Sequence, residues 1–258
     1  MTYGIRVSAP GKLFLSGEYA VLEGAEAVID SVGRRVWAIP VRDNIPQSLL
    51  LRDVSKTVAA FLAERAGSSA GQLPNIEIDS TGFSIANHKL GIGSSAAVAA
   101  SATGALFEWA GLDIDSHREM ICEVATAAHR AYQKGKGSGA DVATSVYGGT
   151  IIFSGSRPVV QSRVTDLNKV FVWTGKPAST VSLMEKVRKL HMEAPDRYRE
   201  VMMPMVSLAG RLASAYRDGE SSSLIDLTRQ YGEAMAALGN AASVPIVTDK
   251  MTHIADIA

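Results

Sequence analysis

The stretch KLGIGSSAAVAASATGAL, residues 89–106, contains the strongest structural signal in this sequence. Residues 94–109 are rich in strong helix formers, which predicts a buried helix. The Gly-x-Gly turn at 91–93 would place the unpaired N–H groups of the helix, and the positive end of its dipole, at the turn. A helix N-terminus of this kind can bind a phosphate group. The alternative is that Ser94 simply caps an ordinary core helix.

The composition restricts the classes of protein to which this chain can belong. It has 258 residues, is 47% hydrophobic and has no formal net charge, so it can form one large domain or two small ones. The balanced charge gives no general reason to expect a nucleic acid or membrane partner. We find no apolar run of membrane-spanning length and no signal-peptide pattern. The single cysteine, Cys122, suits a reducing compartment, so we expect a soluble cytoplasmic protein.

Hydrophobic periodicity predicts an α+β fold in which strands come first and helices later. We expect a strand that ends at Pro10, further strands within 11–41, 75–85, 148–154 and 169–175, and helices over 53–65, 94–109, 116–133 and 142–147. Ser116 and Glu119 would form a capping box for the third of these helices. Residues 180–239 are expected to be helical, with breaks at Pro195 and Pro204. The chain would divide into two domains near residue 165.

Three glycine-containing turns carry the residues from which chemistry is expected. In APGKLFLSGEYAVLEG, residues 9–24, Lys12 follows Pro-Gly at a bend where its side chain can point into a cleft. The second turn is residues 91–95, with Lys89 just before it. The third is KGKGSGAD, residues 134–141, which ends on Asp141. Taken singly, each has an ordinary explanation, such as a surface lysine or a helix cap.

Taken together, the three turns resemble the motifs of the GHMP kinase superfamily. Pro10-Gly11-Lys12 with Gly17-Glu18 matches the first motif, residues 91–97 match the phosphate loop, and Asp141 falls where mevalonate-type members keep an active-site aspartate. The resemblance implies a two-domain α+β fold. Its N-terminal ATP-binding domain, residues 1–165, would be like domain 2 of ribosomal protein S5, and its C-terminal domain, residues 166–258, ferredoxin-like. No stretch of 154–258 matches the third glycine-rich motif, so that domain is expected to be incomplete.

Within the superfamily, the motifs look most like those of phosphomevalonate kinases. Tyr19, Lys89 and residues 135–141 all differ from the usual mevalonate kinase pattern. An acceptor phosphate, largely dianionic at neutral pH, needs little help from a base but extra cations to offset repulsion. Basic residues of that kind lie beside the motifs: Lys12, Lys89, Arg130, Lys134, Lys136 and Lys176. The resemblance thus implies transfer of the ATP γ-phosphoryl group to 5-phosphomevalonate, giving 5-diphosphomevalonate and ADP. Mevalonate kinase, diphosphomevalonate decarboxylase and a non-catalytic nucleotide-binding protein remain open as alternatives.

The resemblance also implies roles for individual residues, with ATP and Mg²⁺ as cofactors. Lys12, Lys89 and Asp141 would be catalytic, and Ser95, helped by Asp141, would bind Mg²⁺. The nucleotide phosphates would be bound by Gly91, Ile92, Gly93, Ser94, Ser95 and Ala96. Substrate contacts are expected from Glu18, Tyr19, Ser138, Gly139, Ser179 and Thr180, with helix capping as the alternative for Ser138, Ser179 and Thr180.

Overall fold

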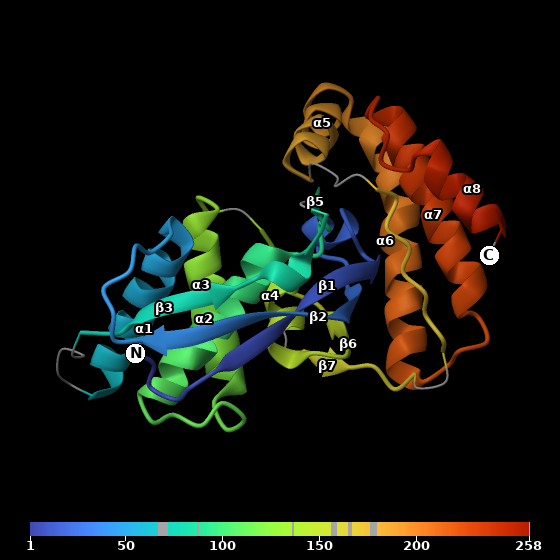
Figure 1. Cartoon of the computed structure of the whole chain (residues 1–258). Coiled ribbons are helices and arrows are strands. Elements are labelled where there is room, and N and C mark those ends of the chain that lie inside the picture. The colour runs from blue at the N-terminus through green and yellow to red at the C-terminus, as the bar shows by residue number, and fades with distance from the viewer. Residues whose placement is uncertain are drawn as a thin grey trace. The chain divides into compact units, whose positions relative to one another are not determined.

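The computed structural model describes residues 1–66, 72–86, 88–135, 137–155, 159–164, 167–175 and 180–257. These residues form two compact units (Figure 1). The first contains residues 1–13 and 29–151, and the second contains residues 14–28 and 152–258. This division differs from the expected boundary near residue 165. Residues 14–28 group with the second unit because Tyr19, Ala20 and Val28 are buried in its hydrophobic core.

The sheet of the first unit is built around one long strand. This strand, β2 (Ala27–Val41), pairs with β1 (Val7–Ser16), β3 (Asn75–Asp79) and β6 (Thr150–Phe153). The pairing of β2 with β3 is antiparallel, from Trp37 opposite Asp79 to Val41 opposite Asn75. A separate hairpin of β4 (Ser84–Ile85) and β5 (His88–Lys89) follows the short 3-10 helix η2 (Thr81–Phe83) and leads into the glycine-rich loop.

Strand β1 does not end at Pro10, so the expected bend before Lys12 is wrong. The strand runs through Pro10, Gly11 and Lys12 as far as Ser16. It lies at one end of the strand order, where a proline without an N–H is tolerated. Other contacts complete its backbone hydrogen bonds: the Ser145 hydroxyl donates to the Pro10 carbonyl oxygen, and the Lys12 amide donates to the Ile92 carbonyl oxygen at 2.9 Å.

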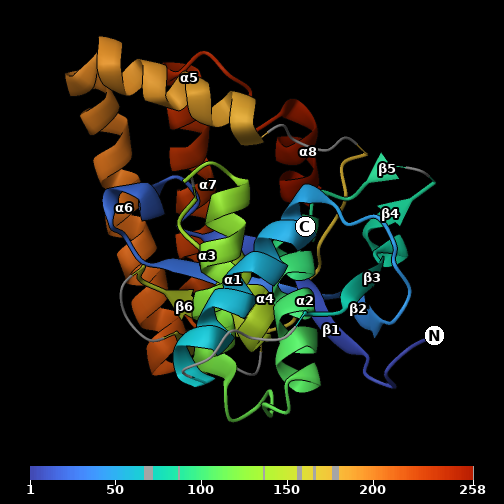
Figure 2. The same ribbon diagram turned by 90° about the vertical axis from the view of Figure 1, so that its left-hand side faces the viewer.

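Four helices pack with this sheet: α1 (Leu49–Ala66), α2 (Ser94–Trp109), α3 (Arg118–Tyr132) and α4 (Ala140–Tyr147) (Figure 2). Helix α2 has the predicted bounds and packs against each of the other three. It is buried on almost every side, and its alanines allow that close approach on all faces. Its Leu106 and Phe107 join Ala38 and Ile76 of the sheet in one hydrophobic cluster.

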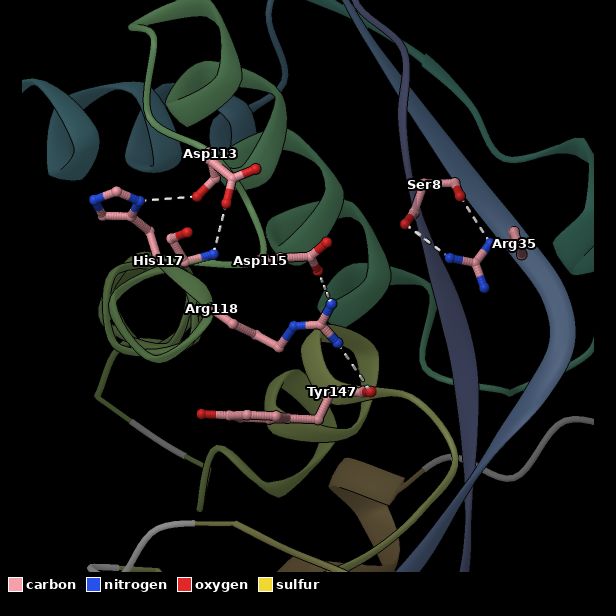
Figure 3. A network of polar contacts seen from close by, with 8 residues as sticks. Ser8, Arg35, Asp113, Asp115, His117, Arg118 and Tyr147 are labelled. Atoms are coloured by element: carbon pink, nitrogen blue, oxygen red, sulfur yellow. Dashed lines mark hydrogen bonds and ion pairs between the residues drawn. The ribbon is translucent and has the colours of Figure 1, made fainter.

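Helix α3 begins two residues later than predicted, and the expected capping box of Ser116 and Glu119 does not form. Instead, the Asp113 carboxylate accepts a hydrogen bond from the Ser116 amide at 2.8 Å (Figure 3). Hydrogen bonds from the Ser116 hydroxyl and then from its amide lower the pKa of Asp113. Arg118, the first residue of the helix, pairs with Asp115 and donates to the Tyr147 carbonyl oxygen at the end of α4. Asp113 thus holds the turn that precedes α3, while the N-cap residue of the helix, His117, makes no side-chain capping hydrogen bond.

The second unit is mostly helical. Besides the 3-10 helix η1 (Ala20–Glu23) and the short strand β7 (Val160–Gln161), it contains α5 (Thr180–Glu193), α6 (Pro195–Asp218), α7 (Leu224–Ala241) and α8 (Asp249–Ile257). Helix α6 packs against α5 and α7. The predicted break at Pro195 is confirmed, but Pro204 lies inside α6, where the buried Met202 and Met205 flank it. No helix in the described ranges is both long enough and apolar enough to cross a membrane.

The segment 169–175, expected to be a strand, pairs with no other strand in the described part of the chain. Its apolar residues are correspondingly open to solvent: Val170 is 86% exposed and Val172 58%. Its run of β-branched and aromatic residues is typical of a strand, but a strand forms only where a neighbour supplies hydrogen-bond partners. The local sequence pattern was therefore not enough to predict whether this segment pairs as a strand.

Candidate active site

The glycine-rich loop ends directly at the N-terminus of α2, as the sequence predicts. Gly93 is the residue before the helix, with a left-handed φ of 77°, and its carbonyl oxygen accepts the first helical hydrogen bond, from Ala97. The amides of Ser94, Ser95 and Ala96 therefore lie in the first turn, where N–H groups have no partner within the helix. Together with the helix dipole, they form an end suited to an anion.

Strand β1 holds this loop and places Lys12 against it. A β-carbon on Gly11 would lie 2.8 Å from the Ile92 carbonyl oxygen, so only glycine permits the approach that the Lys12–Ile92 hydrogen bond requires. A β-carbon on Gly93 would lie 3.0 Å from Cε of Lys12 and 3.2 Å from its Cγ. The aliphatic part of Lys12 thus lies across Gly93, at the start of the helix.

Substitution of Gly93 by alanine should displace the Lys12 side chain. We expect Gly93→Ala to lower turnover about 10- to 100-fold, because small displacements of a catalytic group are costly. Gly111→Ala is the matched control, since Gly111 has a similar φ of 79° but nothing within 4 Å of an added β-carbon. Steady-state kinetics and thermal unfolding of both variants check this. Equal turnover in the two variants would contradict the contact with Lys12.

His129 lies against Ser95 of the predicted site, although sequence reasoning did not single it out. This α3 residue is only 2% exposed, and its Nε2 lies 3.0 Å from the Ser95 Oγ. Burial lowers the pKa of His129; the positive charge of Lys12 lowers it further, and the negative charge of Asp141 opposes both. The imidazole of His129 is therefore in hydrogen-bond contact with Ser95, and the charges of Lys12 and Asp141 both affect its pKa. The only sequence signal was a histidine on the apolar face of a predicted helix.

Asp141 lies in the first turn of α4, so a second helix N-terminus contributes to the site. Gly139 precedes this helix with a φ of 91°, and the Asp141 Oδ1 accepts a hydrogen bond from the Val142 amide at 2.9 Å. Ser138 acts in local capping: its hydroxyl accepts from the Ala140 amide at 3.3 Å, and its carbonyl oxygen accepts from Arg130 at 2.9 Å. These contacts favour a loop-holding role for Ser138.

The other predicted site residues have different surroundings. Lys89 is exposed on β5, two residues before the loop. Glu18 and Tyr19 belong to the second unit, where the Tyr231 hydroxyl donates to the Glu18 carbonyl oxygen at 2.8 Å. Tyr19 is 4% exposed, and burial raises its pKa to about 12, so its environment favours core packing over substrate contact. Three residues lie outside the described residues: Lys136, Lys176 and Ser179. The side chain of Thr180, the first residue of α5, is also outside them.

The donor set at the site suits a magnesium ion that is held partly by a nucleotide. In the described part of the chain, no group of three or more His, Cys, Asp or Glu residues is arranged to hold a metal by itself. Ser95 and Asp141 supply a hydroxyl and a carboxylate, each in the first turn of a helix. Mg²⁺ prefers oxygen ligands and commonly combines one or two protein groups with substrate phosphates. These residues fit that pattern.

Part of the chain matches a known protein family, and longer stretches match characterised relatives. Residues 53–149 match the family described as GHMP kinases N terminal domain. The chain is 26% identical over 328 aligned residues to a phosphomevalonate kinase from Streptomyces sp. (strain CL190), covering 100% of this chain and 86% of that protein. It is 29% identical over 221 residues to a mevalonate kinase from Archaeoglobus fulgidus, covering 81% and 73%.

Among solved structures, the fold resembles Streptococcus pneumoniae phosphomevalonate kinase in complex with phosphomevalonate and AMPPNP. The TM-score is 0.73 at 18% identity, over 92% of this chain and 81% of that one. The match over residues 53–149 thus relates this part of the chain to the GHMP kinases, and the α+β fold of the whole chain matches solved structures of phosphomevalonate kinase and mevalonate kinase. It is accordingly a phosphotransferase, and its relatives include proteins named phosphomevalonate kinase and mevalonate kinase.

Proposed function

We propose that this protein transfers the γ-phosphoryl group of ATP to the phosphate of 5-phosphomevalonate. The observation that carries the proposal is the meeting of the loop at α2, Lys12 and Asp141 around His129, all within the first unit. The names of the Streptomyces relative and of the Streptococcus structure support this acceptor. So do Tyr19, Lys89 and the sequence at 135–141, which differ from the usual mevalonate kinase pattern.

In the proposed reaction, an oxygen of the acceptor phosphate attacks the γ-phosphorus of ATP. A new P–O bond forms to the acceptor, the bond between the γ-phosphorus and the β–γ bridging oxygen breaks, and ADP leaves. The amides of the loop and of the first turn of α2 would hold the nucleotide phosphates. Lys12 would balance charge that develops on the transferred group, which is the main requirement in phosphoryl transfer.

Asp141 and Ser95 would serve the metal rather than proton removal. An acceptor phosphate has a second pKa near 6, so at neutral pH it attacks largely as the dianion and needs little help from a base. A bound magnesium ion would supply neutralisation of the phosphate oxygens. Ser95 and Asp141 would hold it, and Asp141 would also orient the positively charged residues nearby.

A coupled assay of ADP release, with each acceptor offered separately, tests the proposal. We expect 5-phosphomevalonate to support a kcat/KM at least about 100-fold higher than mevalonate, because a site built for a charged group rejects an analogue that lacks it. Preference for mevalonate would favour mevalonate kinase activity, which the Archaeoglobus relative also suggests. Release of CO₂ would indicate a decarboxylase, and nucleotide binding without turnover a binding protein. Each of these three results contradicts the proposal.

A further inference from the structure

The environment of His129 is unusual for the helix on which it lies. The buried positions of α3 are otherwise apolar: Ile121, Val124, Ala125 and Ala128. Burial of an imidazole among such residues is costly unless its nitrogens find partners. Its Nε2 has one in the Ser95 hydroxyl, 34 residues earlier in the chain. A polar contact thus joins the inner face of α3 to the first turn of α2.

A second neighbour sets the direction of this hydrogen bond. The side-chain amide nitrogen of Gln133, one helical turn after His129, lies 3.4 Å from the same Nε2. Because an amide –NH₂ can only donate, this contact favours the tautomer in which Nε2 carries the lone pair. In that tautomer the Ser95 hydroxyl, 3.0 Å from Nε2, is a donor.

The direction matters for what Ser95 can do. A serine hydroxyl has one proton and two lone pairs, and without a partner it rotates among its staggered positions. If it donates its proton to His129, one position is selected and its lone pairs face away from the imidazole. An oxygen held in this way is prepared to accept a bond from a cation. Ser95 also lies in the first turn of α2, where the phosphates of a nucleotide would bind.

We infer that His129 is a positioning residue, which holds the Ser95 hydroxyl so that its lone pairs face the metal of a metal–nucleotide complex. The inference rests on the proposed function, because it adds to the same site a residue that contacts a proposed metal ligand. Groups that orient metal ligands by hydrogen bonding to them typically contribute about 10- to 100-fold to metal affinity. The rival explanation is structural: the contact merely satisfies two polar groups that folding has buried.

Three variants separate these explanations: His129→Phe keeps an aromatic ring without an acceptor, His129→Gln restores an acceptor oxygen, and Ser95→Ala removes the ligand. Calorimetric titration of the whole protein with AMPPNP, with Mg²⁺ and again with EDTA, gives a readout independent of turnover. We expect His129→Phe to weaken binding about tenfold with Mg²⁺ and little with EDTA. His129→Gln should recover most of the loss, and His129→Phe should add little to Ser95→Ala.

Equal losses with and without Mg²⁺, no recovery in His129→Gln, or additive losses in the double variant would overturn the inference. If the wild-type protein does not bind AMPPNP with Mg²⁺, the proposed function fails as well. If it binds and His129→Phe binds equally tightly, only the positioning role fails. Nitrogen-15 NMR of histidine-labelled wild-type protein tests the role without any variant: we expect Nε2 of His129 to be unprotonated, and a protonated Nε2 would contradict the inference.

Discussion

Replacement of Lys12 by alanine is expected to lower turnover by about 10³-fold or more, at saturating ATP and acceptor. In phosphoryl transfer most of the catalysis comes from cations and donors that face the transferred group, and removal of one such cation has effects of this size. Lys12 is the candidate because its side chain lies across Gly93 at the start of α2 and its positive charge lowers the pKa of His129.

The fold should survive this substitution. Lys12 is held in β1 by its backbone amide, which donates to the Ile92 carbonyl oxygen whatever the side chain. Lys12→Met keeps the aliphatic part that packs on Gly93 and is therefore the matched variant for loss of charge alone. Steady-state kinetics and thermal melting should find both variants folded and nearly inactive. Near-normal turnover in either variant would remove Lys12 from the mechanism.

Asp141→Asn is expected to lower turnover about 10²- to 10³-fold, with a smaller effect on stability. Asparagine keeps a side-chain oxygen that can accept from the Val142 amide, so the first turn of α4 retains its local hydrogen bond. What disappears is the negative charge, which would hold the metal and orient nearby cations. Asp141→Ala removes both and should also lower the melting temperature.

The dependence of the Asp141→Asn rate on metal concentration gives this prediction its second readout. If Asp141 serves the metal, the concentration of Mg²⁺ needed for half-maximal rate should rise in the variant, and excess Mg²⁺ should restore part of the turnover. A loss of rate with no change in the Mg²⁺ requirement would assign Asp141 to orientation of the lysine. An unchanged rate would exclude Asp141 from the site.

Much of the candidate site could be predicted from sequence because its parts are local. A Gly-x-Gly turn before an alanine-rich run determines both the helix and the open amides at its start, and α2 has the predicted bounds, Ser94–Trp109. Asp141 after a glycine-rich turn likewise places a carboxylate in the first turn of α4. Such features depend on backbone conformation over a few residues, which composition largely controls.

Contacts between distant segments were not predictable in the same way. Pro10 was expected to end a strand, yet β1 continues because other segments satisfy the groups around it. Tyr19 was expected to meet substrate and is buried in the core of the second unit. The apolar segment 169–175, expected to be a strand, has no strand partner in the described part of the chain. In each case the outcome depends on which surfaces meet, and that information is not in a local pattern.

By itself, the sequence determined the α+β class, the start of α2 directly after a glycine turn and the place of Asp141 in the first turn of α4, because glycines and helix formers act over one or two turns of chain. Only the tertiary structure decided that His129 lies against Ser95, that Lys12 crosses Gly93, and that Tyr19 is buried. The first two contacts join residues 34 and 81 positions apart in the chain. They form because burial of apolar faces brings β1, α2 and α3 together, and polar groups trapped between those elements must then find partners there.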